Sequence, residues 1–223
     1  MKRQKLAVVC VVAVCCAAMA LVDGGLHLAY PVKSAVKAAL FLLGPLLYAR
    51  WDGRWAWRGL FRMERRGCLS ALLLGLGVFA VILGAYFLLR GIFDFTLITA
   101  LLGENVGVTG ENFLWVALYI SFVNSLLEEF FFRGFAFLAL SGPAGRGFAY
   151  GFSALAFALY HTAMMWGWFS PPLFLLALTG LTAGGLLFNW LNEKNGAIYA
   201  SWMVHLFANL AINGVGLLLF GII

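Results

Sequence analysis

Two adjacent carboxylates and an arginine lie within an otherwise apolar stretch, SLLEEFFFRGF, which runs from Ser125 to Phe135. Ionisable residues at membrane depth usually face the interior of a helix bundle and mark a functional site. In an α-helix, Glu129 and Arg133 share one face because they are four residues apart, so they can form an ion pair. Glu128 points about 140° away from Arg133. We therefore expect the arginine to hold Glu129, and Glu128 is a candidate general base.

Two histidines and an asparagine are the other strongly polar residues deep within apolar runs. His161 ends the segment FALYH, and the segment HLFAN contains His205 and Asn209 four residues apart, on one helix face. Paired donors of this kind can hold the negative charge that develops on a carbonyl oxygen during hydrolysis. Counted at ~1.5 Å per residue from the expected inner helix ends, these groups and Glu128 fall at comparable depth. The pattern predicts one polar layer within the membrane that can activate water.

Polar side chains in membrane helices can also serve only to join helices, through hydrogen bonds that contribute about 0.6 kcal/mol each. We expect that structural role for Asn124, Asn213 and His27. The two glutamates, the arginine, the other two histidines and Asn209 together favour chemistry instead.

The elements that must position these groups are membrane helices. Of the 223 residues, 64% are hydrophobic and only 11% are charged, whereas soluble domains usually carry about 25% charged residues. A helix needs about 20 apolar residues to cross the bilayer core, and only helices or closed barrels satisfy the backbone in lipid. Seven apolar runs are long enough or nearly so: 6–22, 32–49, 68–89, 113–140, 147–168, 172–191 and 197–219. The predicted fold is all-α, a polytopic transmembrane bundle of about seven helices that forms a single membrane domain over 1–223.

The distribution of positive charge predicts the orientation of the bundle. The loop 50–67 holds six arginines, and seven crossings place it on the same side as the basic N-terminal residues. Lys33, Lys37 and Arg90 fall on the opposite side. Because Lys and Arg are enriched in cytoplasmic loops, we expect a cytoplasmic N-terminus and an external C-terminus. The arginine spacing in 50–67 is compatible with a short amphipathic helix and with a solvated basic loop.

Other features exclude alternatives or carry no chemistry. The basic residues cluster between apolar runs, so the net charge of +6 does not indicate a nucleic acid partner. The cysteines have neither zinc-site nor disulfide-framework spacing. The first run could be a cleaved signal peptide, but its length favours a retained helix. The spacings Gly147–Gly151 and Gly180–Gly184 predict close helix packing.

The three motifs together resemble those of the CAAX-protease and bacteriocin-processing family of intramembrane glutamate proteases. EEFFFR is similar to the family's Glu-Glu-x-x-x-Arg motif, FALYH to its Phe-x-x-x-His motif and HLFAN to its His-x-x-x-Asn/Asp motif. They occur in the family's order within 125–210. The resemblance implies an all-helical protease fold in which Glu128 and His161 activate a water molecule. It also implies that His205 and Asn209 stabilise the oxyanion, with Glu129 and Arg133 as supporting residues.

The resemblance further implies a hydrolase in the lipid bilayer that cleaves a membrane-associated peptide or protein. Eukaryotic members cleave prenylated C-terminal tripeptides, whereas bacterial members are associated with peptide processing, bacteriocin immunity and membrane-protein regulation. We expect a bacterial plasma membrane as the location, and no cofactor. A catalytic zinc on Glu128, His161 and His205 is an alternative. The alternative functions are a non-catalytic immunity or regulatory factor and an ion or proton carrier.

Overall fold

The computed structural model describes residues 2–26, 28–62, 65–165 and 167–223. All regular elements of these residues are helices, which confirms the all-α prediction. His27, which we expected to be structural, lies outside the described residues. In chain order the elements are α1 (Lys2–Gly24), α2 (Tyr30–Asp52), the 3₁₀-helix η1 (Trp57–Phe61), α3 (Arg65–Leu89), α4 (Thr96–Val106), α5 (Phe113–Tyr119), the π-helix η2 (Ile120–Asn124), α6 (Ser125–Glu128), the π-helix η3 (Glu129–Ala139), α7 (Leu140–Ala144), α8 (Arg146–Met165), α9 (Pro171–Asn195) and α10 (Tyr199–Leu219).

Six helices of the described residues are long and apolar enough to cross a membrane. The longest is the 32-residue span Phe113–Ala144, which is built from α5, η2, α6, η3 and α7. We expected about seven crossings, and the remaining run, 147–168, forms α8, which is not among the six. The reason is compositional, because α8 carries Tyr150, Ser153, Tyr160 and His161 among its apolar residues. The chain is therefore an integral membrane protein with a polytopic helical bundle.

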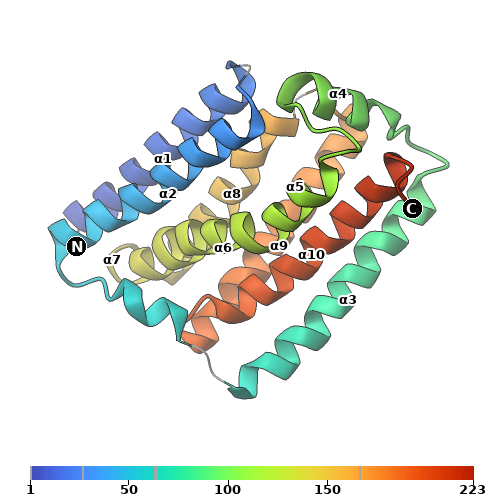
Figure 1. The fold of residues 1–223 in the computed structure, drawn as a ribbon. Coiled ribbons are helices and arrows are strands. Elements are labelled where there is room, and N and C mark those ends of the chain that lie inside the picture. Colours follow the sequence, from blue (N-terminus) through green and yellow to red (C-terminus); the bar gives the residue numbers. More distant parts are fainter. Residues whose placement is uncertain (1, 27, 63–64, 166) are drawn as a thin grey trace.

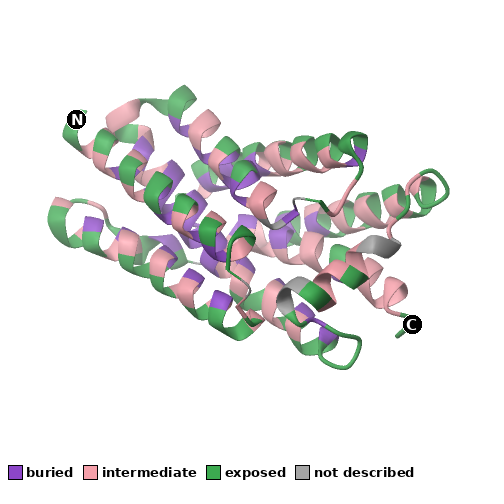
Figure 2. Ribbon diagram, turned by 90° about the horizontal axis from the view of Figure 1, so that it is seen from above, coloured by how far each residue is buried: buried purple, intermediate pink, exposed green. Residues whose placement is uncertain are grey.

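The long helices run side by side (Figure 1). The hairpin of α1 and α2 forms one side of the bundle, α3 lies against α10 on the other side, and the α5–α7 span lies between them. The two chain ends lie at opposite ends of the bundle (Figure 1). Buried residues gather where the helices face one another, and exposed residues lie on their outer faces (Figure 2). The α5–α7 span is the most buried of the six, so it forms the centre of the fold.

Local sequence explains where several helices begin and end. Prolines stand in the first turns of α2 and α9, where the missing N–H would have no partner within the helix. Gly53 and Gly196 follow these two helices with φ of 67° and 62°. That left-handed conformation is favourable for glycine, which lacks a Cβ, and it ends both helices at the N-terminal end of the bundle.

The two glycine pairs for which the sequence predicted close helix packing do not lie at tight helix contacts. A Cβ built on Gly147, Gly151, Gly180 or Gly184 would meet nothing within 4 Å. The close approach of α8 and α9 occurs instead at Gly185, where a Cβ would lie 3.0 Å from the Cα atom of Ala154.

The segment after α2 packs against the centre of the bundle. Leu60 of η1 is 4% exposed. A Cβ built on Gly134 of η3 would lie 2.6 Å from the Cδ1 atom of Leu60. The Ile198 amide also donates to the Leu60 carbonyl at 2.9 Å. Over the described residues 50–62 the segment is therefore not one continuous helix: its arginines are exposed, and Leu60 packs into the bundle.

The two lysines that we counted among external charges lie inside the bundle. Lys33 and Lys37 belong to α2 and are only 5% and 7% exposed. They therefore say little about orientation, and they bring positive charge to the interior.

Candidate active site

The motif glutamates and arginine lie at the centre of the long α5–α7 span. Glu128 ends α6 and is 2% exposed, while Glu129 and Arg133 of η3 are fully buried. The sequence predicted an ordinary α-helix here, but 129–139 forms a π-helix. In that helix the hydrogen bonds run from i to i+5, so Glu128 and Arg133 are about one turn apart instead of on divergent faces.

Side chains from neighbouring helices support the irregular backbone of this span. Asn209 of α10 donates to the Ile120 carbonyl at 3.2 Å, and Asn213 donates to the Ala117 carbonyl at 3.1 Å. Ser153 of α8 donates to the carbonyl of Phe132 at 2.7 Å. Backbone groups in lipid must be satisfied within the protein. These contacts explain how π-helical turns, which are often found at functional sites, are stable here.

Glu128 faces both motif histidines. Its Oε1 atom lies 3.9 Å from His161 Nε2, and its Oε2 atom lies 3.6 Å from His205 Nε2. The Nδ1 atom of His161 is 2.7 Å from the Phe157 carbonyl. Because a carbonyl oxygen only accepts, Nδ1 carries a proton, and Nε2 is the ring nitrogen that faces the carboxylate. The structure thus brings one carboxylate and two imidazoles from three separate helices to one point.

Glu129 holds the other side of His205. Its Oε1 atom is 2.9 Å from His205 Nδ1 and 3.6 Å from Arg133 Nε. The guanidinium of Arg133 lies 4.1 Å from the ring centroid of Phe157 and 5.1 Å from that of Phe188. The expected ion pair between Glu129 and Arg133 is present. Its geometry is not a two-pronged hydrogen bond, because aromatic rings cover the guanidinium.

The strongest partner of Glu128 was not anticipated. Lys37 of α2 forms a buried ion pair with Glu128 Oε1 and also donates to Asn124 Oδ1 at 2.6 Å. Asn124 in turn donates to Glu128 Oε1 at 3.0 Å. We had interpreted Asn124 as a residue that only joins helices, and Lys37 as an external charge. The available signal was the position of Lys37 within the apolar run 32–49, where an ionisable residue usually has a function.

Asn209 is the one predicted site residue that the structure does not bring to the carboxylates. Its side-chain amide donates to the backbone of Ile120, one helical turn along α10 from His205. The same side chain is only partly buried. A part in holding an oxyanion therefore requires Asn209 to exchange this carbonyl for the substrate.

Two buried cations lie beside the two carboxylates of the cluster. Lys37 and Arg133 oppose the two glutamates, and Lys37 contacts Glu128 Oε1. Within the part of the chain that the structure describes, no group of three or more His, Cys, Asp and Glu side chains is arranged to hold a metal ion. The arrangement can bind water by hydrogen bonds and move a proton.

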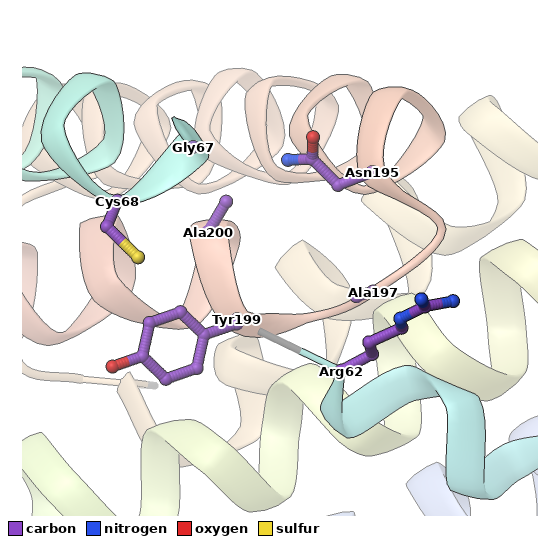
Figure 3. Close-up of a pocket in the computed structure, with 7 residues that line it drawn as sticks. All are labelled: Arg62, Gly67, Cys68, Asn195, Ala197, Tyr199 and Ala200. Atoms are coloured by element: carbon purple, nitrogen blue, oxygen red, sulfur yellow. The ribbon is translucent and has the colours of Figure 1, made fainter. Parts of the chain in front are cut away.

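A surface pocket at the N-terminal end of the bundle is separate from this cluster (Figure 3). It lies where the segment after η1, the start of α3 and the turn between α9 and α10 meet. Its lining consists of Arg62, Gly67, Cys68, Asn195, Ala197, Tyr199 and Ala200. None of these residues belongs to the carboxylate–histidine cluster, so we do not assign the chemistry to this pocket.

Comparison with known proteins agrees with the motifs. Residues 110–211 match the family model described as type II CAAX prenyl endopeptidase Rce1-like. No curated protein and no solved structure is similar enough to count as a match. The matched segment includes Glu128, His161 and His205 and excludes Lys37. Residues 110–211 are thus similar to the Rce1-like type II CAAX prenyl endopeptidases, in agreement with the three motifs that they contain.

Proposed function

We propose that this protein is an intramembrane endopeptidase that hydrolyses a peptide bond of a membrane-associated peptide or protein. The observation that carries the proposal is the meeting of Glu128 with His161 and His205, at 3.9 Å and 3.6 Å, inside a bundle of membrane helices. A carboxylate and an imidazole at this separation can both bind one water molecule. General acid–base catalysis requires such hydrogen-bond reach.

In the proposed reaction, a water molecule donates one hydrogen bond to Glu128 and the other to His161 Nε2. Its lone pair then attacks the scissile carbonyl carbon, and the water proton passes to the Glu128 carboxylate. A carbon–oxygen bond forms and the carbonyl oxygen becomes an oxyanion. When the carbon–nitrogen bond breaks, the protonated Glu128 returns its proton to the leaving amine.

We assign the oxyanion to donors on α10. His205 lies between the two glutamates, with Nδ1 at 2.9 Å from Glu129 Oε1, and an imidazolium in this place would donate from both ring nitrogens. Asn209 lies one turn away on the same helix. Its amide becomes a second donor when it leaves the Ile120 carbonyl, and donors aimed at developing charge are the main electrostatic source of catalysis.

Access to the cluster requires movement of the helices. The Glu128 side chain is 3% exposed, whereas the His161 side chain is 14% exposed. This difference supports access from the His161 side, beside the C-terminal half of α8. We also propose a bacterial plasma membrane with the N-terminus in the cytoplasm, based on the arginines of 50–67.

The test compares purified wild type with Glu128→Gln on a quenched peptide in detergent, together with membrane-peptide proteomics of cells that carry each form. We expect the variant to lose cleavage and its products to disappear from the proteome. Glu193→Gln is the matched control, because Glu193 pairs with Arg146 at the exposed end of the bundle. Unchanged cleavage in Glu128→Gln would instead favour a non-catalytic regulatory or immunity factor.

A further inference from the structure

A buried lysine from outside the family segment lies on the proposed general base. Lys37 is 7% exposed, and its ammonium contacts Glu128 Oε1 and donates to Asn124 Oδ1. The same ammonium lies 4.9 Å from the ring centroid of Tyr160 and 5.5 Å from that of Phe41. Two acceptors and two aromatic faces therefore fix this side chain in one position.

The contacts of Lys37 and Asn124 make the two oxygens of Glu128 unequal. Oε1 accepts hydrogen bonds from both side chains, so its lone pairs are occupied. Among the described residues, the contact of Oε2 is a looser one with His205 Nε2, at 3.6 Å. A water molecule that is to lose a proton needs a carboxylate oxygen with a free lone pair, and Oε2 meets that requirement.

We propose that Lys37 is a positioning residue for the general base, which holds Glu128 ionised and fixes Oε1 so that Oε2 takes the proton from water. This inference rests on the proposed function and specifies how its base is set. An ammonium at this depth is costly without a partner, and an ion favours the charged form of a carboxylate within about 4–6 Å. The N-terminal hairpin thereby completes a site whose other residues lie in 110–211.

The chain contains a matched control for Lys37. Lys33 lies one turn away on α2, is 5% exposed, and donates to the backbone carbonyl of Asp23 at 3.3 Å. It has the same side chain, helix and burial as Lys37, but its hydrogen bond goes to a backbone carbonyl and not to the site.

The kinetic test measures kcat and KM for wild type, Lys37→Met, Lys37→Arg and Lys33→Met on the quenched peptide. We expect Lys37→Met to lower kcat by about 100-fold, the lower range of what a general base contributes, with KM nearly unchanged. Lys37→Arg should recover part of the loss because it restores the positive charge. Lys33→Met should keep the wild-type kcat. Equal losses in both methionine variants, or none in Lys37→Met, would overturn the proposal.

A thermal unfolding cycle tests the contact without relying on activity. It compares Lys37→Met, Glu128→Gln and the double variant in detergent by tryptophan fluorescence. Removing one member of a buried ion pair leaves the other charge unpaired, so we expect each single variant to lower Tm and the double variant to lie well above the additive value. Additive shifts would refute the pairing. A wild type that cleaves no peptide would overturn the proposed function, whereas an active wild type with a fully active Lys37→Met would overturn only the role of Lys37.

Discussion

Glu128 and Glu129 are neighbours in the chain but lie in contrasting surroundings. Glu128 accepts hydrogen bonds from Lys37 and Asn124 and faces two imidazoles. Glu129 binds the far nitrogen of His205, and its Oε2 atom has no hydrogen-bond partner among the described residues. Glu128 thus has an ammonium and two imidazoles beside it, and Glu129 contacts the far side of one of those imidazoles. Identical side chains have different surroundings because different helices face them.

The two cations of the cluster differ in the same way. Lys37 is a hydrogen-bond donor to Glu128 and Asn124. The guanidinium of Arg133 makes no hydrogen bond within the described part of the chain, and it lies against the rings of Phe157 and Phe188. Positive charge over an aromatic face is stabilised by the ring quadrupole. We infer that Arg133 supports the fold around Glu129, whereas Lys37 acts on the base.

The largest expected effect separates the two carboxylates. Glu128→Gln should lower kcat by about 10⁴-fold, the upper range for loss of a general base. Glu129→Gln should cause a smaller loss, because the glutamine oxygen can still accept a hydrogen bond from His205. Single-turnover rates on the quenched peptide measure both. Equal losses would show that the two glutamates act as one unit and would remove the distinction.

Loss of the buried arginine should affect stability more than chemistry. Arg133→Ala leaves Glu129 buried without its cation, which costs about 3–5 kcal/mol. The free energy of unfolding of Arg133→Lys should lie between those of wild type and Arg133→Ala. Lysine keeps the positive charge, but its ammonium lacks the planar face that stacks on Phe157 and Phe188. Denaturant unfolding in mixed micelles measures the free energy of unfolding.

Arg146→Ala is the control for this series, since the Arg146 side chain is 70% exposed in its ion pair with Glu193. Exposed pairs contribute about 0–1 kcal/mol. If Arg133→Ala lowered the free energy of unfolding no more than Arg146→Ala does, the prediction would be wrong. The buried guanidinium would then contribute no more to stability than an exposed one.

Part of this site follows from local sequence. Helical spacing put Glu129 and Arg133 within reach of each other, and counting depth along each helix put Glu128, His161, His205 and Asn209 in one layer. The structure places both imidazoles within 4 Å of Glu128. These predictions succeed because residue spacing and helix rise are local properties that lipid-spanning helices obey closely.

The remainder depends on contacts between distant segments. Lys37 and Glu128 are 91 residues apart, so no spacing rule joins them, and only the packing of α2 against α6 does. The π-helix of 129–139 also has no local signal. Its stability depends on outside donors such as Ser153. Asn209 was assigned to the site by depth, but its amide donates to the carbonyl of Ile120, which also accepts from the Ser125 amide.

A smaller effect should distinguish Asn209 from its neighbour on α10. Asn209→Ala should lower kcat by roughly 10²–10³-fold, the usual result of losing one oxyanion donor. Asn213→Ala is the control, because Asn213 makes the same kind of bond to the Ala117 carbonyl and also donates to Ser121 Oγ at 3.1 Å. It should lower Tm without a comparable change in kcat per folded molecule. If the two variants showed the same changes in kcat and Tm, Asn209 would have only the structural role of a hydrogen bond to the backbone.

The smallest expected effect is that of metal removal, which should leave kcat unchanged. A zinc ion on Glu128, His161 and His205 would lie close to the ammonium of Lys37, which contacts Glu128 Oε1, and the two positive charges would repel each other. Prolonged chelation of purified protein, followed by the quenched-peptide assay, measures the outcome. If activity disappears and stoichiometric zinc restores it, Glu128 is a ligand and not the base. Lys37→Met would then bind zinc more tightly than wild type because a competing cation is gone. In the metal-free mechanism the same variant gains no activity from zinc. The two measurements together therefore decide whether Glu128 pairs with Lys37 as the general base or binds zinc as a ligand.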